Sequence, residues 1–307
     1  MDFLQKLTKA FWISRPIFWI GPLAAYKAGL WAAGIPMGPL QWLEVFIFAF
    51  PASFLIYGLN DIYDREQDRN SSRKSSRVWG EKIREEDVPW VKNWCIAAAL
   101  GMALVGIATL NPIHALLAFS GIAFAYAYSA PPIRLKEKPP LDSLTSACYV
   151  FIPFGLAYTL GGSLDFLDWR FGLLCLNVSA LHAIAAVADM DDDRKEGVRT
   201  IASAFGGRFA ALFAALIFSL NFLMVFLNSG ISPDMALVAE AAALPCILLC
   251  LWLAAFPAQR NGKTALKLLI AYGMLWGYFL VLHYFVFGRH FMQDEFVRAV
   301  PRLLSGN

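Results

Sequence analysis

The chain has 307 residues, of which 58% are hydrophobic and only 16% are charged, and its mean hydropathy is +0.54. This apolar share exceeds that of ordinary soluble proteins, so the composition predicts an integral membrane protein. The net charge is only +3 and the basic residues gather in a few loops, so the charge gives no indication of a nucleic-acid partner.

The N-terminal segment is predicted to be a retained first span. Lys6 and Lys9 precede an apolar stretch, as in a signal peptide, but Arg15 interrupts that stretch and no convincing small-residue cleavage site follows. The five cysteines lie within or beside apolar segments and form no metal-type Cys-x-x-Cys pair, so we expect buried free thiols.

Nine apolar stretches are long enough to cross the roughly 30 Å hydrocarbon core of a bilayer as helices. They are predicted at residues 12–33, 39–59, 93–110, 112–130, 142–162, 170–188, 208–228, 235–256 and 266–287. Only helices or closed barrels satisfy the backbone hydrogen bonds in lipid, and no barrel pattern is visible. The predicted fold is therefore all-α, with nine transmembrane helices in one bundle and a single domain over residues 1–307.

The basic residues predict an orientation for this bundle. All but five of the 26 Lys and Arg residues fall on one side of the predicted membrane, and the exceptions are Lys27, Arg170, Arg289, Arg298 and Arg302. Because cytoplasmic loops retain positive residues, the N-terminus is predicted in the cytoplasm and the C-terminus on the opposite face. The loops after the second, fourth and sixth spans then form a cytoplasmic cap, and the membrane is predicted to be the inner membrane of a prokaryote.

Two acidic clusters stand at the cytoplasmic ends of predicted spans. Their members are Asn60, Asp61, Asp64 and Asp68 after the second span, and Asp189, Asp192 and Asp193 after the sixth. At 3.6 residues per turn, each set falls on one helix face, the first within about 100°. Like charges this close repel unless cations neutralise them, and hard oxygen ligands suit magnesium.

Magnesium usually takes one or two carboxylates per ion and completes its shell with water and substrate phosphates. Two facing clusters therefore predict a diphosphate held between several ions. Basic side chains next to the clusters and in a third cytoplasmic loop are predicted to contact the phosphate oxygens. These side chains are Arg65, Arg69, Arg134, Lys136, Arg194 and Lys195.

The simpler alternative is that each acidic run is a solvated loop at the cytoplasmic boundary. One run alone would fit that alternative, whereas two runs at the ends of apolar spans, both with helical spacing, argue against it. Calcium binding in a loop is a further alternative, but the Gly-centred calcium loop is absent from the sequence.

The motifs resemble those of the UbiA-type intramembrane prenyltransferases over nearly the whole chain. The matching features are Asn60-Asp61-x-x-Asp64-x-x-x-Asp68, Asp189-x-x-x-Asp193 followed by Arg194 and Gly197, the nine spans, and Tyr128-Ser-Ala-Pro-Pro-Ile-Arg134-Leu-Lys136. The resemblance implies that Asn60 and the five matched aspartates bind magnesium and the donor diphosphate. It also implies anion contacts from Tyr128, Arg134 and Lys136, and we assign catalysis to Asp64, Asp193, Lys136 and Tyr128.

Shorter stretches resemble one branch of that family. The Tyr-Ser-Ala-Pro-Pro-Ile-Arg-Leu-Lys loop is similar to both chlorophyll synthases and lycopene elongases. Ser14-Arg15-Pro16-Ile17-Phe18-Trp19, Pro140-Leu141-Asp142-Ser143 and the stretch from His182 to Thr200 look more like lycopene elongases. The resemblance therefore implies a carotenoid or another long polyene as acceptor.

Two further ionisable residues have open roles. His182 lies about 20° from Asp189 on the same helix face and two turns deeper in the membrane. It either contacts the substrate and accepts the proton lost after coupling, or it pairs with a neighbouring helix. Arg15 either touches the donor phosphate or extends to the membrane interface.

The predicted activity is magnesium-dependent transfer of a prenyl group, such as geranylgeranyl or dimethylallyl, from its diphosphate to a hydrophobic acceptor. The predicted partners are that donor, the acceptor and membrane lipids. An intramembrane terpene cyclase or diphosphatase with the same donor site is an alternative. An ion-coupled transporter is an alternative of another class, although the acids lie at one rim and no chain of ionisable groups crosses the bundle.

Overall fold

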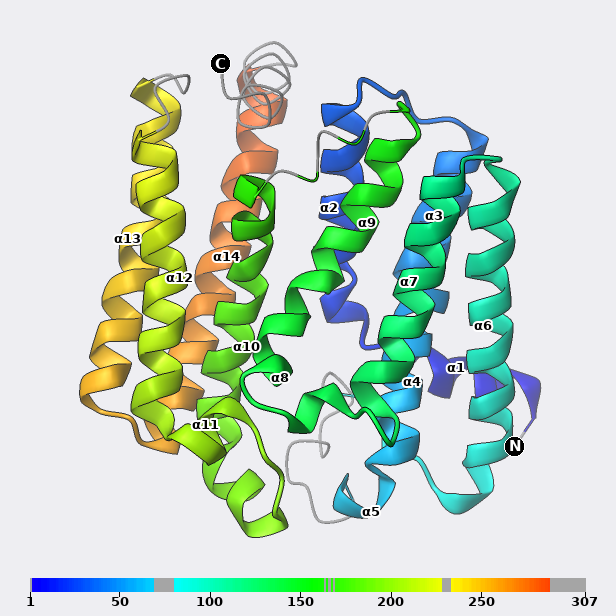
Figure 1. Cartoon of the computed structure of the whole chain (residues 1–307), viewed down its shortest axis with the longest axis horizontal. Helices are drawn as coiled ribbons and strands as arrows, with labels where there is room; N and C mark the ends of the chain where they lie inside the picture. Colours follow the sequence, from blue (N-terminus) through cyan, green and yellow to red (C-terminus); the bar gives the residue numbers. More distant parts are fainter. Residues whose placement is uncertain are drawn as a thin grey trace. The chain divides into compact units, whose positions relative to one another are not determined.

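The computed structural model describes the backbone of residues 2–68, 80–162, 164, 167, 169–227 and 233–287, and the side chains of residues 2–66, 80–162, 164, 167, 169–224, 227 and 243–275. Every regular element in these ranges is a helix, as the sequence predicts (Figure 1). The chain divides into unit 1, Met1–Leu135 with Cys148–Leu164, and unit 2, Lys136–Ala147 with Asp165–Asn307. A single domain over the whole chain stays a prediction.

Unit 1 contains the N-terminal helices and one later helix. Its helices are α1 (Phe3–Ile13), α2 (Ile20–Ala32), α3 (Pro39–Ala49), α4 (Pro51–Tyr63), α5 (Arg65–Asp68), α6 (Val88–Ala108), α7 (Pro112–Ser129) and α9 (Cys148–Thr159), with 3₁₀ turns at Pro16–Phe18 and Glu85–Asp87. α2 packs along α9, and α4 packs along α6 and α7 (Figure 1). The close approach of α2 to α9 requires glycine, because a Cβ on Gly29 would lie 2.4 Å from the Phe154 carbonyl oxygen.

Unit 2 is built around one long helix. Its helices are α8 (Leu141–Leu144), α10 (Trp169–Glu196), α11 (Ile201–Phe205), α12 (Gly207–Leu227), α13 (Pro233–Ala255) and α14 (Gln259–Phe287), with a 3₁₀ turn at Thr145–Ala147 and another, Leu135–Glu137, at its boundary. The long helix α10 packs against α12 and α14. Alanines on α10 and α12 are fully buried in this core, and such small side chains let membrane helices approach closely.

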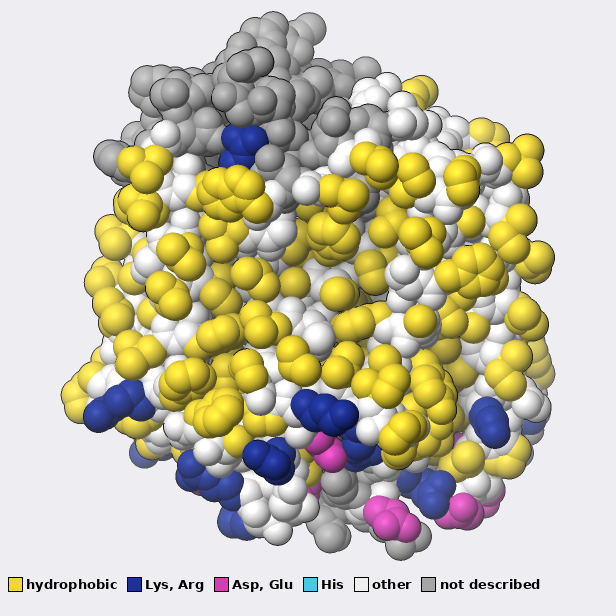
Figure 2. All heavy atoms as spheres, viewed as in Figure 1, with side chains coloured by type: hydrophobic (Ala, Val, Ile, Leu, Met, Phe, Trp, Pro, Cys, Tyr) yellow, Lys and Arg dark blue, Asp and Glu magenta, His cyan; other side chains and the backbone are white. Residues whose placement is uncertain are grey.

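Five helical stretches among the described residues are long and apolar enough to cross a membrane. They are Pro39–Tyr63, Glu85–Ala108, Pro112–Ser129, Trp169–Glu196 and Gly207–Met224. Figure 2 shows hydrophobic side chains along the visible middle of the long helices, whereas Lys and Arg side chains gather near helix ends. A membrane protein is thus supported, and nine crossing helices stay a prediction.

The predicted span 12–33 is interrupted at Arg15. α1 ends at Ile13, Arg15 adopts a left-handed backbone with φ of 52°, and the α-helix resumes only at Ile20 as α2, which runs for 13 residues. Pro16 causes the break, because proline disfavours the α conformation in the residue before it and lacks an N–H donor. Figure 1 shows α1 crossing the direction of the other helices of unit 1.

The predicted loop 189–207 also differs from the structure. α10 continues through the second acidic cluster to Glu196, and Gly197, with φ of +73°, follows its end. Glycine suits this position because it adopts the left-handed conformation without a steric penalty. The second acidic cluster therefore lies on a helix, as its spacing predicts, and only residues after Glu196 form the connection to α11.

A buried polar network joins four helices of unit 1. Glu44 on α3 accepts a hydrogen bond from the Tyr26 hydroxyl of α2, and its Oε1 lies 3.0 Å from Nε2 of His114 on α7. Nδ1 of His114 lies 2.9 Å from the Leu156 carbonyl of α9 and 3.3 Å from the Thr159 hydroxyl. All these side chains are buried, so the network fixes how α2, α3, α7 and α9 pack.

We expect His114→Ala to destabilise the protein strongly. The substitution leaves the buried Glu44 carboxyl without its imidazole partner, and removing one partner of a buried polar pair lowers the free energy of unfolding by about 1–3 kcal/mol. Thermal unfolding of the detergent-solubilised protein measures the loss. Leu116→Ala is the matched control, because Leu116 lies on the same helix but is 64% exposed. Equal losses in the two variants would show that the network does not stabilise unit 1.

Candidate functional site

The first acidic cluster lies at the C-terminal end of α4. Asn60 and Asp61 lie in the last turn, and Asp64 caps the helix with its backbone N–H donating to the Asn60 carbonyl at 2.9 Å. The Asp61 side chain is fully buried, whereas that of Asp64 is 15% exposed. Residues three apart share a helix face, so the helix points both carboxylates the same way.

Arg15 binds the buried carboxylate of this cluster. Its Nη2 lies 2.9 Å from Oδ1 of Asp61, and its guanidinium carbon lies 4.4 Å from the centre of the Tyr57 ring. A Cβ on Gly80 would lie 3.0 Å from Nε of Arg15, so the chain at residue 80 also closes over the guanidinium. Of the two roles open from sequence, extension to the interface does not describe this side chain, because it is only 11% exposed and turned onto Asp61.

Arg134 binds the second carboxylate of the cluster. Its Nη2 lies 3.0 Å from Oδ1 of Asp64, and both side chains are largely buried. The backbone of Arg134 has φ of 42°, and its N–H donates to the Ala130 carbonyl at the end of α7. The structure thus brings together two residues 70 positions apart that the sequence assigned to one site.

The other predicted residues of unit 1 lie next to this cluster in sequence, on α7, or outside the described part. Arg65 pairs with the exposed Glu85 at 2.8 Å. Tyr128 is half-buried on α7, with its ring 6.1 Å from that of Phe124. The side chain of Asp68 and the whole of Arg69 lie outside the described residues.

The second acidic cluster occupies the last turns of α10. Oδ2 of Asp193 accepts a hydrogen bond from the Thr200 hydroxyl at 3.0 Å, which ties the cluster to the N-cap of α11. Asp192 turns toward α14, where its Oδ2 accepts from Nε2 of Gln259 at 2.9 Å and lies 3.9 Å from Lys263. Asp189 is half-buried one turn earlier.

The predicted basic residues of unit 2 are more exposed. Arg194 is 48% exposed, lies 3.9 Å from Asp191 and donates from Nε to the Ser203 carbonyl at 3.3 Å. Lys195 is 76% exposed and lies 3.6 Å from Asp192. Lys136 is half-buried in the 3₁₀ turn at the unit boundary. The charges of Arg194 and Lys195 thus lie next to the acidic turns of α10.

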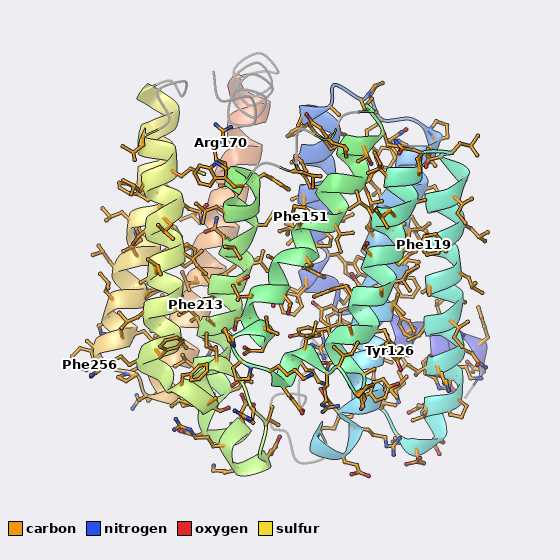
Figure 3. The ribbon with its side chains drawn as sticks, in the orientation of Figure 1. Phe119, Tyr126, Phe151, Arg170, Phe213 and Phe256 are labelled. Atoms are coloured by element: carbon orange, nitrogen blue, oxygen red, sulfur yellow. The ribbon has the colours of Figure 1, made fainter. Side chains whose placement is uncertain are left out.

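His182 lies on α10 two turns before Asp189. Its Nδ1 is 3.2 Å from the Ser143 hydroxyl of α8, which is fully buried. Arg170 lies near the start of the same helix (Figure 3). Since 19 residues of helix span about 28 Å, α10 places Arg170 and Asp189 roughly one hydrocarbon thickness apart.

The carboxylate and amide oxygens of the two clusters are the kind of ligand that magnesium prefers. Among the described residues, no three His, Cys, Asp or Glu side chains lie close enough together to hold one metal ion. Magnesium commonly needs only one or two carboxylates, since water and phosphate oxygens complete its shell. The oxygen ligands of each cluster, taken separately, therefore suit an ion that is bound together with a diphosphate.

Sequence reasoning assigned no role to three residues that take part in hydrogen bonds near the second acidic cluster or near His182. Thr200 could have been noticed from its capping spacing with Ser203, because a hydroxyl before a helix commonly serves as N-cap. Asp142 could have been noticed as a carboxylate inside a predicted apolar span. Gln259 carries no local signal, since its contact with Asp192 depends on how α14 packs on α10.

Comparison with known proteins gives consistent matches. A sequence profile of the UbiA prenyltransferase family matches residues 22–278. A lycopene elongase/hydratase of Haloferax volcanii is 30% identical over 275 residues, covering 86% of this chain and 87% of the relative. The bacteriochlorophyll synthase 33 kDa chain of Cereibacter sphaeroides is 28% identical over 211 residues, covering 64% and 66%.

Solved structures share the fold. A UbiA homolog from Archaeoglobus fulgidus bound to DMAPP and Mg²⁺ superposes with a TM-score of 0.61 at 20% identity, covering 87% of this chain and 98% of that one. The apo structure of a UbiA homolog from Aeropyrum pernix also has a TM-score of 0.61, at 19% identity, covering 89% and 97%.

We expect Arg15→Met to destabilise the protein far more than Arg65→Met. The first change leaves the fully buried Asp61 without its guanidinium, whereas Glu85, the partner of Arg65, is 76% exposed. The expected losses are about 3–5 kcal/mol for the buried pair and under about 1 kcal/mol for the exposed one. Thermal unfolding in detergent without added magnesium measures both. Similar losses would contradict the assignment of Arg15 as the counter-charge of Asp61.

Proposed function

The chain belongs to the UbiA prenyltransferase family, and from that membership we propose that it transfers a prenyl group from a polyprenyl diphosphate to a carotenoid such as lycopene. The observation that carries the donor site is the pair of guanidinium–carboxylate contacts at the end of α4, Arg15 with Asp61 and Arg134 with Asp64. Such a site presents ligands for a cation and donors for an anion side by side. A magnesium diphosphate needs both.

The lycopene elongase/hydratase of Haloferax volcanii, which matches this chain over most of its length, supports a carotenoid acceptor. A long polyene also suits a protein whose long helices are apolar, because both reactants then enter from the lipid. The donor is proposed to be geranylgeranyl or dimethylallyl diphosphate.

Magnesium is proposed as the cofactor. The residues that would hold it are Asn60, Asp61, Asp64, Asp68, Asp189, Asp192 and Asp193. When bound, it would neutralise charge on the diphosphate as the carbon–oxygen bond breaks. The basic side chains Arg134, Lys136, Arg194 and Lys195, with the Tyr128 hydroxyl, would bind the phosphate oxygens and stabilise the leaving group.

The chemistry is a substitution at an allylic carbon. The diphosphate leaves with the electron pair of the carbon–oxygen bond, and a double bond of the acceptor forms the new carbon–carbon bond. The cation left on the acceptor then loses a proton or captures water. Apolar helices around the reacting carbons keep bulk water out, because water would convert the allylic cation to an alcohol.

The proposed topology has nine crossing helices, a cytoplasmic N-terminus and a cap formed by the connections after the second, fourth and sixth spans. In each unit the acidic cluster lies at an end of a long apolar helix, which supports a site at the membrane surface. In this arrangement the diphosphate binds at the cytoplasmic rim and its prenyl tail extends into the bilayer.

Membranes containing the protein should convert labelled geranylgeranyl diphosphate and lycopene to a prenylated carotenoid, detected by mass. A chelator should abolish the product and magnesium should restore it. Asp64→Asn and Asp193→Asn should abolish transfer at saturating magnesium while the purified variants stay folded, because each amide keeps the size of the carboxylate but removes the charge that binds the ion. Products formed from the donor alone would favour the cyclase or diphosphatase alternative, and near-normal transfer in either variant would contradict the donor site.

Single cysteines should report the proposed topology in a background without the five native cysteines. Glu66→Cys and Arg199→Cys lie on exposed positions next to the two acidic clusters, and Leu110→Cys lies at the turn between α6 and α7, where the native side chain is 89% exposed. An impermeant thiol reagent should label position 110 in intact cells and positions 66 and 199 only after the cytoplasmic face is opened. Opposite faces for positions 66 and 199 would rule out one diphosphate between the clusters.

A further inference from the structure

His182 on α10 lies at one end of a chain of hydrogen-bonded polar side chains. Nδ1 of His182 lies 3.2 Å from Oγ of Ser143, and the same hydroxyl donates to Oδ2 of Asp142 at 3.3 Å. Oδ2 of Asp142 also accepts the backbone N–H of Ile201 at 2.8 Å. Asp142 and Ser143 are fully buried, and all four residues belong to unit 2.

The charge at the end of this chain selects one tautomer of the imidazole. The Ser143 hydroxyl has one proton, and a neighbouring carboxylate attracts it, so the hydroxyl donates to Asp142 and accepts from the ring. Nδ1 therefore carries the ring proton, and Nε2 carries the lone pair that can take up another. The carboxylate, linked through one hydroxyl, also stabilises the positive charge that the ring gains on protonation.

The position of His182 on α10 fits a role below the donor diphosphate. Asp189 and Asp193 follow it by seven and eleven residues of continuous helix, so both lie within about 20° of His182 on the same face. The axial separation from Asp189 is about 10 Å toward the middle of the helix. A prenyl diphosphate bound at the acidic turns would extend its hydrocarbon past this depth.

We propose that His182 is the catalytic base of the transfer and that Ser143 and Asp142 are its positioning residues. This inference rests on the proposed function. The carbon–oxygen bond of the donor breaks with its electrons leaving on the diphosphate, and a π pair of the acceptor forms the carbon–carbon bond. Nε2 of His182 then takes the proton, either from the carbon next to the cation, whose C–H electrons form a new double bond, or from the water that adds to the cation.

The competing explanation is that the hydrogen bond between His182 and Ser143 only holds α8 against α10. A second hydrogen bond has that role alone, because the Ser179 hydroxyl, one turn from His182, donates to the Leu144 carbonyl at 3.0 Å. Ser179→Ala is therefore a matched control. It removes a hydrogen bond between the same two helices without touching the chain from Asp142 to His182.

His182→Asn is the main test, with lycopene and labelled geranylgeranyl diphosphate as substrates. The asparagine amide can still donate to Ser143 but cannot take a proton, so kcat should fall about 100-fold or more while the donor KM changes less than about twofold. Asp142→Asn, which removes the charge, should lower kcat about tenfold, and Ser143→Thr, which keeps the hydroxyl, should retain most activity. In His182→Ala, added imidazole should restore turnover in proportion to its concentration.

The outcomes separate this inference from the function on which it rests. A wild-type protein that transfers nothing to lycopene overturns the proposed function. A wild-type protein that transfers, together with a His182→Asn variant whose kcat is nearly unchanged, overturns the base assignment alone. An equal fall in kcat in Ser179→Ala and Asp142→Asn likewise shows that His182 only packs α8 against α10. The same conclusion follows if imidazole does not restore turnover in His182→Ala. Should His182→Ala not fold, Asp142→Asn and His182→Asn decide the question, because both are close in size to the native residues.

Discussion

Both acidic clusters lie at the end of a helix where negative charge is least favourable. The backbone dipoles of a helix leave partial negative charge at its C-terminus, and α4 and α10 each place aspartates there. In unit 1 the burial of Asp61 strengthens the repulsion, because a low dielectric screens it poorly. Each cluster therefore requires cations. In unit 1 they are the guanidinium groups of Arg15 and Arg134, and in unit 2 Lys195 and Lys263 lie near Asp192.

The same constraint shapes the rest of unit 1. The buried Glu44 contacts Tyr26 and His114, and the buried Asp87 contacts Lys9 and Trp90. Each of these buried acidic side chains therefore has a polar or basic partner within unit 1. In unit 2 the core is instead rich in alanine, and these small side chains let α10 pack closely on α12.

The sequence predicted features that depend on local pattern and missed those that depend on packing between helices. Apolar runs predicted the helices, and the spacing from Asn60 to Asp64 predicted one shared face, because helix period alone determines both. The break in the predicted span 12–33 was missed, although Pro16 marks its position. Arg15 was left with two open roles, because the fold of residues 14–19 decides between them. Ile201, which donates to Asp142, and Gln259, which donates to Asp192, are 59 and 67 positions away along the chain, and no spacing rule reaches that far.

Because of the ion pairs at α4, binding of the proposed donor must replace the partner of each charge that it separates. Replacing a buried carboxylate's partner is costly if either charge is left alone in the core. A magnesium diphosphate carries both signs, so the cation can compensate Asp61 and Asp64 while the phosphate oxygens compensate the arginines. Arginine suits this exchange better than lysine, because its planar group has five donors and can keep one on a carboxylate while others contact an anion. The pairing of Arg15 with Asp61 and of Arg134 with Asp64 is thus the arrangement expected of a site that must hold its charges both before and after the donor binds.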